Sequence, residues 1–520
     1  MALDLNFHSY FSIGIAADSN ALSDEADEEE NIFDEDNYGT FTTAIVSSPD
    51  ITFTSSDGRI TFGAAGTYLF VGDLTWIVGA DGTDTTIKIY KNGSAAYQMT
   101  AIPGFVPPLS PICASYHTVL DINAGDYIEV KVSSDDTGTI TVQEGTTFVA
   151  LKANGDYGSL TYTAAANAQS SNGDLDAIGD SDLGGTVATN LNNVTFQAEA
   201  GTLTPANTRP FLMLSTLAGV HSKFNEVVFS LYANNSAIDT TSATIHKNLD
   251  PQEVTYGILK ALTGGQTASS RFQSVASGTP GKITIKGGTS FTIFDASNNG
   301  GTYPSAYLSL AVNADSDNNT TGDIICFDSN EWGSYADTDH VTATGITFTA
   351  DGGTFVVANA GKYFILWNLI IGSASANDTT RTVKIKNGTT VVYTAPWRFN
   401  NNFDPLEKTV CLIVDAAAGD SFTFVVNNPD GDFDAGTAIS MFKVDEVNDL
   451  YAQSVPTDSL IADDFTINGF SADGLSPQHD RVVQKQVPFL LGVRGPLSLR
   501  GRSLSTTETP PNVSTGDKKN

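Results

Sequence analysis

Short stretches in which apolar and polar residues alternate recur along this chain of 520 residues and predict β-strands. Three of them read "YFSIGIAADSN" from Tyr10, "SLTYTAAANAQ" from Ser159 and "AYLSLAVNADS" from Ala306, and each runs into a turn-rich segment. Val, Ile, Phe and Tyr favour strands, while Gly, Ser, Asn and Asp favour the turns that join them. The pattern therefore predicts an all-β protein.

The strand pattern repeats three times at domain-sized intervals. "ITFT" at Ile51 returns as "VTFQ" at Val194 and "ITFT" at Ile346, which are offsets of 143 and 152 residues. The same two offsets separate "GTYLFVGDLTW", "RPFLMLSTLAG" and "GKYFILWNLII". Because independent segments keep one spacing, the chain contains three copies of one module.

The repeats place the modules at residues 8–153, 157–297 and 304–446, and leave residues 447–520 as a C-terminal tail outside the repeat. The Gly- and Asn-containing stretches "NGDYG" and "SNNGGTYP" separate the modules and indicate short linkers or sharp turns. One core stops growing at about 250–300 residues, so several domains are expected for this length.

A Gly-Asp pair marks one turn in the first module, Gly125-Asp126, and in the third, Gly419-Asp420. We interpret it as a β-hairpin turn in which Gly permits the reversal and Asp accepts backbone N–H groups. These residues are thus structural landmarks and not catalytic acids. The middle module has "ALTGGQ" (261–266) instead and is the most diverged copy.

Together these segments resemble the C1q/TNF-type jelly roll, in the first and third modules above all. The matching residues are Gly66, Tyr68, Phe70, Leu120, Gly125, Asp126 and Phe148 in the first module, Gly361, Tyr363, Val414, Gly419 and Asp420 in the third, and Phe211 and Phe291 in the second. The resemblance implies three tandem jelly-roll β-sandwiches, with a partly extended tail, and trimerisation about a threefold axis. One chain could form a pseudo-trimer, or three chains could align into stacked trimeric tiers. The short linkers favour a homotrimer of three chains.

The charge of the chain argues against two classes of binding partner. The formal net charge of −33 makes the chain repel nucleic acid and anionic membranes, and no apolar run reaches the length of a membrane span. Three widely spaced cysteines predict buried thiols and no disulfide framework. No secretory signal is expected at the N-terminus.

Catalytic and metal motifs are not recognisable in the sequence. It contains no Walker loop, G-x-S-x-G or H-E-x-x-H pattern, and its six histidines lack metal-ligand spacing. We therefore expect a non-enzymatic protein without a cofactor. The acidic run "DEADEEENIFDEDN" offers a weak candidate for Ca²⁺, with a solvated acidic block as the preferred interpretation. Its candidate ligands are Asp24, Glu28, Asp34 and Asp36.

Two further groups of residues are candidates for contacts. Aromatic residues expected on loops could contact a sugar, a protein partner or another subunit, namely Trp332, Tyr335, Trp397 and Phe399. Trp76 and Trp367 are instead expected in the core. A basic segment on this acidic chain suggests docking onto an acidic surface, with disorder as the equal alternative, and its residues are Arg481, Lys485, Arg494, Arg500 and Arg502.

The function expected from this resemblance is structural. Repeated C1q/TNF-like modules with a separate docking segment suggest a viral, in particular bacteriophage, virion protein at the particle surface. It would be a trimeric capsid decoration or fibre that contacts capsid or other virion proteins and a host-surface glycan or protein. The alternative is a bacterial surface or secreted adhesin that binds carbohydrate. The step from fold to function rests on analogy.

Overall fold

The computed structural model describes most of residues 9–445 and two short pieces beyond them. The described residues are 9–22, 29–38, 41–78, 85–101, 111–134, 139–153, 155–163, 169–170, 175–176, 178, 187–221, 225–245, 252–275, 282–297, 304–312, 315–316, 322–330, 342–372, 379–399, 406–427, 432–445, 466–467 and 470–471.

The first module is a sandwich of two antiparallel sheets, in the orders β11-β6-β12-β1-β3, with β9 on the other edge of β6, and β4-β5-β10-β7-β8, with β2 on β10. Its strands are β1 (Tyr10–Ile15), β2 (Glu30–Asn31), β3 (Thr43–Ser47), β4 (Ile51–Thr54), β5 (Arg59–Phe62), β6 (Gly66–Val78), β7 (Thr85–Lys91), β8 (Ser94–Ala101), β9 (Ile112–Ile122), β10 (Tyr127–Ser134), β11 (Ile140–Val142) and β12 (Thr147–Lys152). Two 3₁₀ turns, η1 (Glu35–Asn37) and η2 (Ser55–Asp57), lie between them.

The second module repeats this design in the orders β14-β24-β19-β25-β13-β16, with β22 on β19, and β17-β18-β23-β20-β21, with β15 on β23. Its elements are β13 (Tyr157–Tyr162), β14 (Gln169–Ser170), β15 (Leu175–Asp176), β16 (Val187–Asn192), β17 (Val194–Gln197), η4 (Ala198–Ala200), β18 (Thr202–Pro205), β19 (Arg209–His221), β20 (Asn225–Ala233), β21 (Ser236–Ile245), β22 (Gln252–Leu262), β23 (Ala268–Val275), β24 (Lys282–Ile285) and β25 (Ser290–Asp295).

The third module has the sheets β28-β26-β37-β31-β34, with β36 on β31, and β29-β30-β35-β32-β33, with β27 on β35. Its strands are β26 (Tyr307–Ala311), β27 (Asp323–Ile325), β28 (Thr342–Thr344), β29 (Ile346–Thr349), β30 (Thr354–Val357), β31 (Gly361–Gly372), β32 (Thr379–Asn387), β33 (Thr390–Phe399), β34 (Leu406–Ala416), β35 (Ser421–Asn427), β36 (Asp432–Phe433) and β37 (Ala438–Lys443). The all-β fold of three tandem jelly-roll sandwiches is confirmed, and the described residues contain no α-helix.

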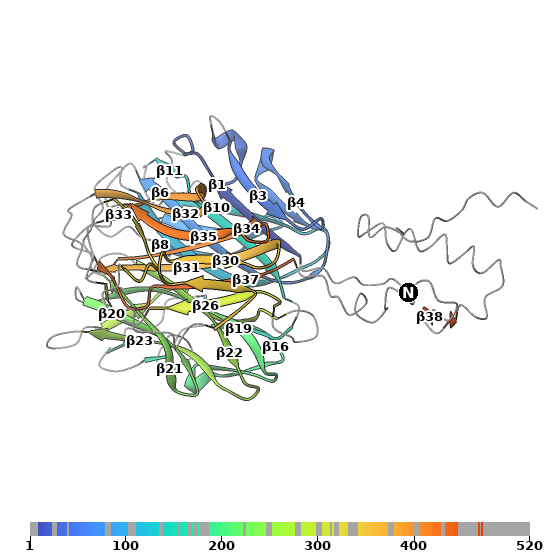
Figure 1. The fold of residues 1–520 in the computed structure, drawn as a ribbon, viewed down its shortest axis with the longest axis vertical. Coiled ribbons are helices and arrows are strands. Elements are labelled where there is room, and N and C mark those ends of the chain that lie inside the picture. The colour runs from blue at the N-terminus through green and yellow to red at the C-terminus, as the bar shows by residue number, and fades with distance from the viewer. Residues whose placement is uncertain are drawn as a thin grey trace, which may run out of the picture. The chain divides into compact units, whose positions relative to one another are not determined.

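Residues 1–447 form one compact unit, and residues 448–520 form a second. In the second unit the structure describes β38 (Thr466–Ile467), which pairs with β39 (Phe470–Ser471). Among the described residues, no helix is long and apolar enough to cross a membrane. Figure 1 shows the strands of the three modules side by side within the first unit.

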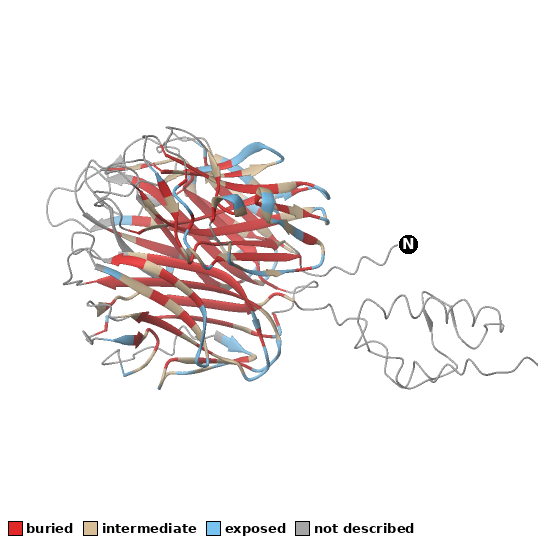
Figure 2. Cartoon of the chain, turned by 90° about the horizontal axis from the view of Figure 1, so that it is seen from above, coloured by how far each residue is buried: buried red, intermediate tan, exposed pale blue. Residues whose placement is uncertain are grey.

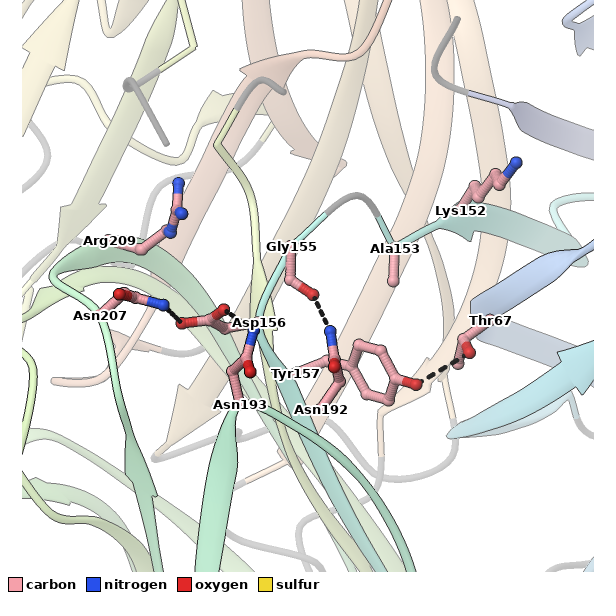
Figure 3. A pocket seen from close by; sticks show the side chains of 10 residues that line it. All are labelled: Thr67, Lys152, Ala153, Gly155, Asp156, Tyr157, Asn192, Asn193, Asn207 and Arg209. Carbon is pink, nitrogen blue, oxygen red and sulfur yellow. Dashed lines mark hydrogen bonds between the residues drawn. The ribbon is translucent and has the colours of Figure 1, made fainter. Parts of the chain in front are cut away.

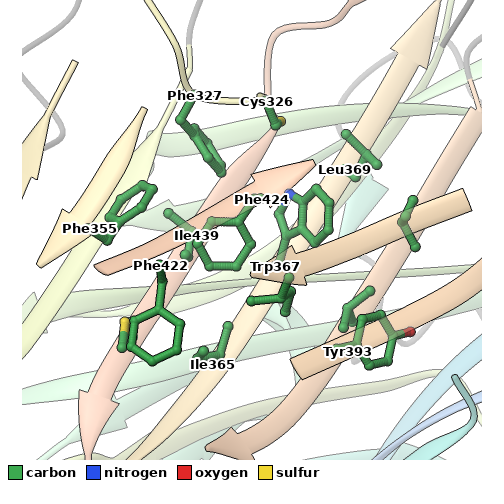
Figure 4. Packing of buried hydrophobic residues seen from close by; sticks show 14 of the residues in the cluster. Cys326, Phe327, Phe355, Ile365, Trp367, Leu369, Tyr393, Phe422, Phe424 and Ile439 are labelled. Atoms are coloured by element: carbon green, nitrogen blue, oxygen red, sulfur yellow. The ribbon is translucent and has the colours of Figure 1, made fainter. Parts of the chain in front are cut away.

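Each module encloses its own aromatic-rich core. In the third module Trp367 is fully buried, and its ring meets that of Phe424 edge-on at 5.2 Å between centroids. Phe355 packs edge-on against the same Phe424 ring at 5.4 Å (Figure 4). Trp76 is likewise fully buried in the core of the first module. Edge-to-face aromatic packing of this kind stabilises a core beyond the area it buries.

The long strands β6, β19 and β31 supply two cores each. In β6, Tyr68 and Phe70 point into the core of the first module, whereas Leu69 and Val71 join a separate cluster. Because neighbouring side chains of a strand point to opposite faces, both faces of β6 are buried. This explains why "GTYLFVGDLTW" is apolar without a polar alternation.

The separate cluster, here called the axial core, draws buried residues from all three modules. Its members are Tyr10, Leu69, Val71, Val119, Val149 and Leu151 from the first module, Leu212, Leu214, Leu259, Phe294 and Ala296 from the second, and Phe364, Leu366, Cys411, Ile413, Phe442 and Val444 from the third. Figure 2 shows buried residues, in red, running through the interior of the described strands. One chain therefore packs its three modules around a common core.

We expected the modules to pack against each other between three separate chains, and this expectation is wrong. The faces expected to meet between chains are already buried against each other within one chain. Although the linker between β12 and β13 is short, modules that follow each other around an axis also bring these ends close together. Any self-association of whole chains would need other surfaces.

Candidate functional site

The contact between modules is the best-defined candidate site, and a ring of hydrogen bonds lies at its centre. The hydroxyl of Ser115 donates to the backbone oxygen of Thr409 at 3.2 Å. Thr409 donates to the oxygen of Thr255 at 2.5 Å, and Thr255 donates to the oxygen of Ser115 at 2.7 Å. These three buried residues, here called the axial polar ring, lie on β9, β22 and β34. The ring satisfies polar groups that the module contact removes from water.

A second set of polar residues backs the ring from β6, β19 and β31. Asp73, Thr216 and Asn368 each lie opposite the ring residue of their own module in the strand register. The polar side-chain atoms of the three pairs are 3.2, 2.8 and 3.2 Å apart, in the same order. The spacing of these residues along the chain is 143 and then 152, the same as in the sequence repeat. The modules are thus related by an approximate threefold axis through the ring.

A buried ion pair departs from this symmetry. The Nζ atom of Lys408 lies 3.0 Å from Oδ2 of Asp73, and both side chains are fully buried. Lys408 also donates to Thr75 Oγ1 at 3.3 Å and to Cys113 Sγ at 3.1 Å. Burial alone would lower the pKa of Lys408, but the charge of Asp73 holds it well above its usual value. The pair joins the third module to the first.

Two tyrosines tie a neighbouring module by its backbone. Tyr393 of the third module donates to the oxygen of Gly145 in the first at 3.0 Å, and Tyr97 of the first donates to Gly288 in the second at 3.1 Å. Both glycines have positive φ angles, 84° and 93°. A Cβ atom on Gly145 would come within 2.2 Å of Ala395 Cβ, so this position needs both the conformation and the small size of Gly.

Two partly exposed carboxyl groups lie beside the polar ring. Glu253 Oε2 accepts from the backbone N–H of Ser115 at 2.8 Å, and its Oε1 lies beside the hydroxyl oxygen of Thr255. Glu407 Oε1 lies 3.0 Å from the hydroxyl oxygen of Thr409. Burial raises the pKa of Glu253 to about 8, and burial together with the charge of Glu253 raises the pKa of Glu407 well above its usual value. This part of the contact therefore favours protonated carboxyl groups.

The predicted turn residues lie away from the axis, where each module crosses between its sheets. Gly125 has a φ of 89°, and Asp126 Oδ2 accepts from the N–H of Asn123 at 2.7 Å. The strand before this turn, β9, pairs in one sheet, and the strand after it, β10, pairs in the other. The turn is therefore not the β-hairpin that we expected but a sheet-to-sheet connection. Gly419, with Asp420, makes the same turn in the third module.

The middle module keeps this turn with a different side chain. Gly265 has a φ of 83°, and Oε1 of Gln266 accepts from the N–H of Thr263 at 2.9 Å. The amide of Gln266 thus replaces the carboxylate of Asp126. The sequence "ALTGGQ" looked divergent, yet its backbone hydrogen bonds are those of the other modules.

The predicted Ca²⁺ ligands lie only partly within the described residues. Asp34 accepts from the N–H of Asp36 at 3.0 Å and caps η1, and Asp36 is exposed. Asp24 and Glu28 lie outside the described residues. Within the part that the structure describes, no three or more His, Cys, Asp or Glu side chains lie close enough to hold a metal ion.

One predicted contact aromatic belongs to a core instead. Trp397 is only 3% exposed and packs in the third module from strand β33, so placing it on an exposed loop was wrong. Its strand has alternate side chains facing the sandwich, and Trp397 occupies one of these inward positions. Phe399 ends the same strand. Trp332 and Tyr335 lie outside the described residues.

The proposed docking residues of the tail also lie outside the described residues, namely Arg481, Lys485, Arg494, Arg500 and Arg502. The three cysteines carry free thiols, with Cys326 and Cys411 buried and Cys113 partly exposed.

Sequence reasoning missed the axial polar ring and the Lys408–Asp73 pair. A signal for them was available in the sequence. Each of the three long apolar repeats has a polar residue at the same position, which is Asp73 in "GTYLFVGDLTW". A charge inside such a stretch requires a buried partner. That partner, Lys408, lies 335 residues away, and only the closure of the module ring brings it there.

No known protein-family model matches this sequence, and no curated protein matches it either. Among solved structures, the chain is similar to the Eiger TNF of S. frugiperda, with 12% identity, coverage of 28% of this chain and 92% of the other, and a TM-score of 0.19. It is also similar to pika GITRL, with 9% identity, coverage of 27% and 94%, and a TM-score of 0.19. No activity or partner follows from either likeness.

Proposed function

We propose that this chain is a non-enzymatic structural protein of a virus particle, most simply of a bacteriophage, displayed on the particle surface. Residues 1–447 would be the displayed head, and residues 448–520 would attach it to capsid or other virion proteins. The observation that carries the proposal is the axial core, which joins three modules into one unit while the C-terminal residues form a unit of their own.

The internal axis supports a display role. The head buries its module contacts within one chain, so it needs no second chain to complete them. It would act as a single-chain decoration or fibre domain, with its outer surface available for a host-surface glycan or protein. The net charge of −33 of the whole chain favours solubility and disfavours nucleic acid as a partner.

Basic residues in the tail suggest how attachment works. Between positions 481 and 502 the tail carries five Arg and Lys residues on an otherwise strongly acidic chain. Such a segment would be attracted to an acidic capsid surface.

The test is binding to purified particles of the virus whose genome encodes the chain. The full-length protein should cosediment with particles, and a chain that ends at Val447 should not. A third variant with Gln at the five basic positions should bind weakly, and more weakly still as salt rises. The proposal fails if gradient-purified particles lack the protein, or if the shortened chain binds as well as the full one. Binding to bacterial cells without any presence in particles would favour the adhesin alternative.

A further inference from the structure

A polar cleft opens where the first module passes into the second. It has a volume of about 470 Å³, which is within the range of small-ligand sites of roughly 300–1,000 Å³. Its floor is the segment from Gly155 to Tyr157, and side chains of both modules surround it (Figure 3). Most ligand pockets are lined mainly by apolar groups, whereas this cleft is lined mainly by amides, hydroxyls and charged groups.

Three asparagines hold their amide groups in fixed positions around the cleft. The Nδ2 atoms of Asn193 and Asn207 donate to the two carboxylate oxygens of Asp156, at 3.1 and 2.8 Å. Asn192 Nδ2 donates to the backbone oxygen of Gly155 at 2.9 Å. The nitrogen of each amide thus donates to the floor of the cleft. Within the described residues, the amide oxygen has no hydrogen-bond partner. The result is a set of three preorganised acceptors.

Cationic donors complete the lining. Lys152, at the end of β12, has no carboxylate partner among the described residues. Arg209 lies on the opposite side, with its Nε atom 3.3 Å from Asp295 Oδ2. In Figure 3 these two side chains lie on opposite sides of the Gly155 segment.

This mixture of groups discriminates between classes of ligand. A phosphate or other anion could pair with Lys152, but the amide oxygens would repel it, and Asp156 and Asp295 already offset the positive charge. A metal ion would meet two cationic side chains. Hydroxyl groups both donate and accept, so a neutral polyhydroxylated molecule can satisfy amide oxygens and ammonium donors together. Tyr157 adds a ring at the edge of the cleft, with its hydroxyl 2.9 Å from that of Thr67.

Two of the polar groups that the middle module contributes are absent from the other modules. In the strand register, Tyr10 and Tyr307 occupy the place of Tyr157, so Ser9 and Ala306 correspond to Asp156. Neither of them can hold two amides as a carboxylate does. The Arg209 position at the start of the long strand is Gly in both other modules. The second module thus differs from the other two at two positions that line this cleft.

We infer that the cleft is a carbohydrate-binding site in which Asn192, Asn193 and Asn207 accept hydrogen bonds from sugar hydroxyls and Lys152 donates to them. The inference deepens the proposed surface role by naming the class of ligand and its site, and it rests on that role only for its biological setting. The binding itself is a property of the isolated head.

The experiment tests sugar binding to the purified full-length protein. Saturation-transfer NMR detects binding, and calorimetry measures the affinity. The probes are methyl glycosides of glucose, galactose, mannose and N-acetylglucosamine, with glucuronic acid and inorganic phosphate as anionic contrasts. At least one neutral glycoside should bind, and the double variant Asn192→Ala with Lys152→Met should weaken its affinity at least tenfold. Asn190→Ala, which changes an asparagine on the same strand outside the cleft, should leave the affinity unchanged.

Thermal unfolding of each variant checks that the head stays folded, since Asn192 is exposed and Lys152 partly exposed. The inference is overturned if no neutral glycoside binds, if only glucuronic acid or phosphate binds, or if the cleft variant binds as the parent does. Because no virus particle enters this experiment, its failure would leave the particle-attachment proposal standing, and the reverse also holds.

Discussion

The contact between the third and first modules is here called the closure interface. It differs from the other two module contacts, because in those the two modules are also connected by a linker of the chain. β12 ends at Lys152 and β13 begins at Tyr157, so the first and second modules are connected directly. The second and third modules are connected between β25 and β26. No linker connects the third module back to the first. The buried pair of Lys408 and Asp73 lies at this one unlinked contact.

The other two contacts have neutral residues at the same positions. The strand register places Ala114 and Val254 where the third module has Lys408. Thr216 and Asn368 stand where the first module has Asp73. A linker restricts which module faces which, whereas the closure interface must be specified by its side chains. A buried ion pair adds little net stability, but it strongly penalises any packing that leaves one charge unpaired.

The sharpest test of this comparison removes the cation from the closure interface. Lys408→Met leaves Asp73 buried without its counterion, and we expect the free energy of unfolding to fall by about 3–5 kcal/mol in urea titration. Lys386→Met is the matched control, because Lys386 pairs with Asp323 at 3.0 Å on the partly exposed surface of the same module. Its loss should be about 0–1 kcal/mol.

A double variant separates the effect of the unpaired charge from the effect of altered packing. Adding Asp73→Asn to Lys408→Met should recover part of the lost stability, because no unpaired charge remains. Equal losses for Lys408→Met and Lys386→Met would show that the closure interface does not depend on the ion pair.

Glycine substitutions compare the closure interface with a linked one. Gly145→Ala should cost about 1–2 kcal/mol for its positive φ and roughly 1–3 kcal/mol more for the overlap with Ala395. Gly288→Ala, at the contact of the first and second modules, should cost less, because its Cβ would lie 2.8 Å from that of Met99. Gly125→Ala is the control, with a φ of 89° and open space around it, and it should show the conformational cost alone. Thermal unfolding ranks the three, and an equal loss in all would remove the steric part of the argument.

The carboxyl groups beside the ring predict a pH dependence. The pKa of Glu253 is raised to about 8, so the folded head binds a proton that the unfolded chain releases near pH 4.3. Stability from this group is full below about pH 4.3 and is lost as pH rises through about 8. Glu407 acts in the same direction. Asp73 and Lys408 face the same region and also contribute to the pH dependence of the parent. The contribution of Glu253 is therefore the difference in unfolding free energy between the parent and Glu253→Gln.

The urea midpoint of the parent should fall relative to that of Glu253→Gln between pH 5 and 8. A difference that stays constant over this range, or that grows in favour of the parent, would contradict the raised pKa.

The smallest effect is expected at the sheet-to-sheet turn, away from every module contact. Asp126→Asn should cost about 1 kcal/mol at pH 7, because an amide accepts the same N–H groups more weakly than a carboxylate. Backbone and Asn92 hydrogen bonds hold the pKa of Asp126 at about 2. The stability that its charge supplies is present above about pH 4 and disappears as pH falls through about 2. Unfolding midpoints of parent and variant should therefore converge in acid.

The fold was accessible from the sequence because its signals are local. Alternation, turn residues and constant spacing identified three jelly rolls, and the Gly-Asp pair identified a turn. The two sides of that turn could not be assigned to different sheets, since β9 and β10 find their partners β6 and β7 far along the chain. Trp397 was expected on a loop, whereas it lies in strand β33, and its inward position depends on the sheet that packs against that strand.

What the sequence determined by itself was the module, its number of copies and the strongly acidic surface. Those properties depend on residue types and on spacings within about 150 residues. Tertiary structure alone decided that the three copies close around one axis, that Lys408 meets Asp73, and that a polar cleft forms where the first module passes into the second. Lys408 and Asp73 lie 335 positions apart, and the cleft joins residues of two different modules. These contacts depend on how whole sandwiches pack, so no local pattern encodes them.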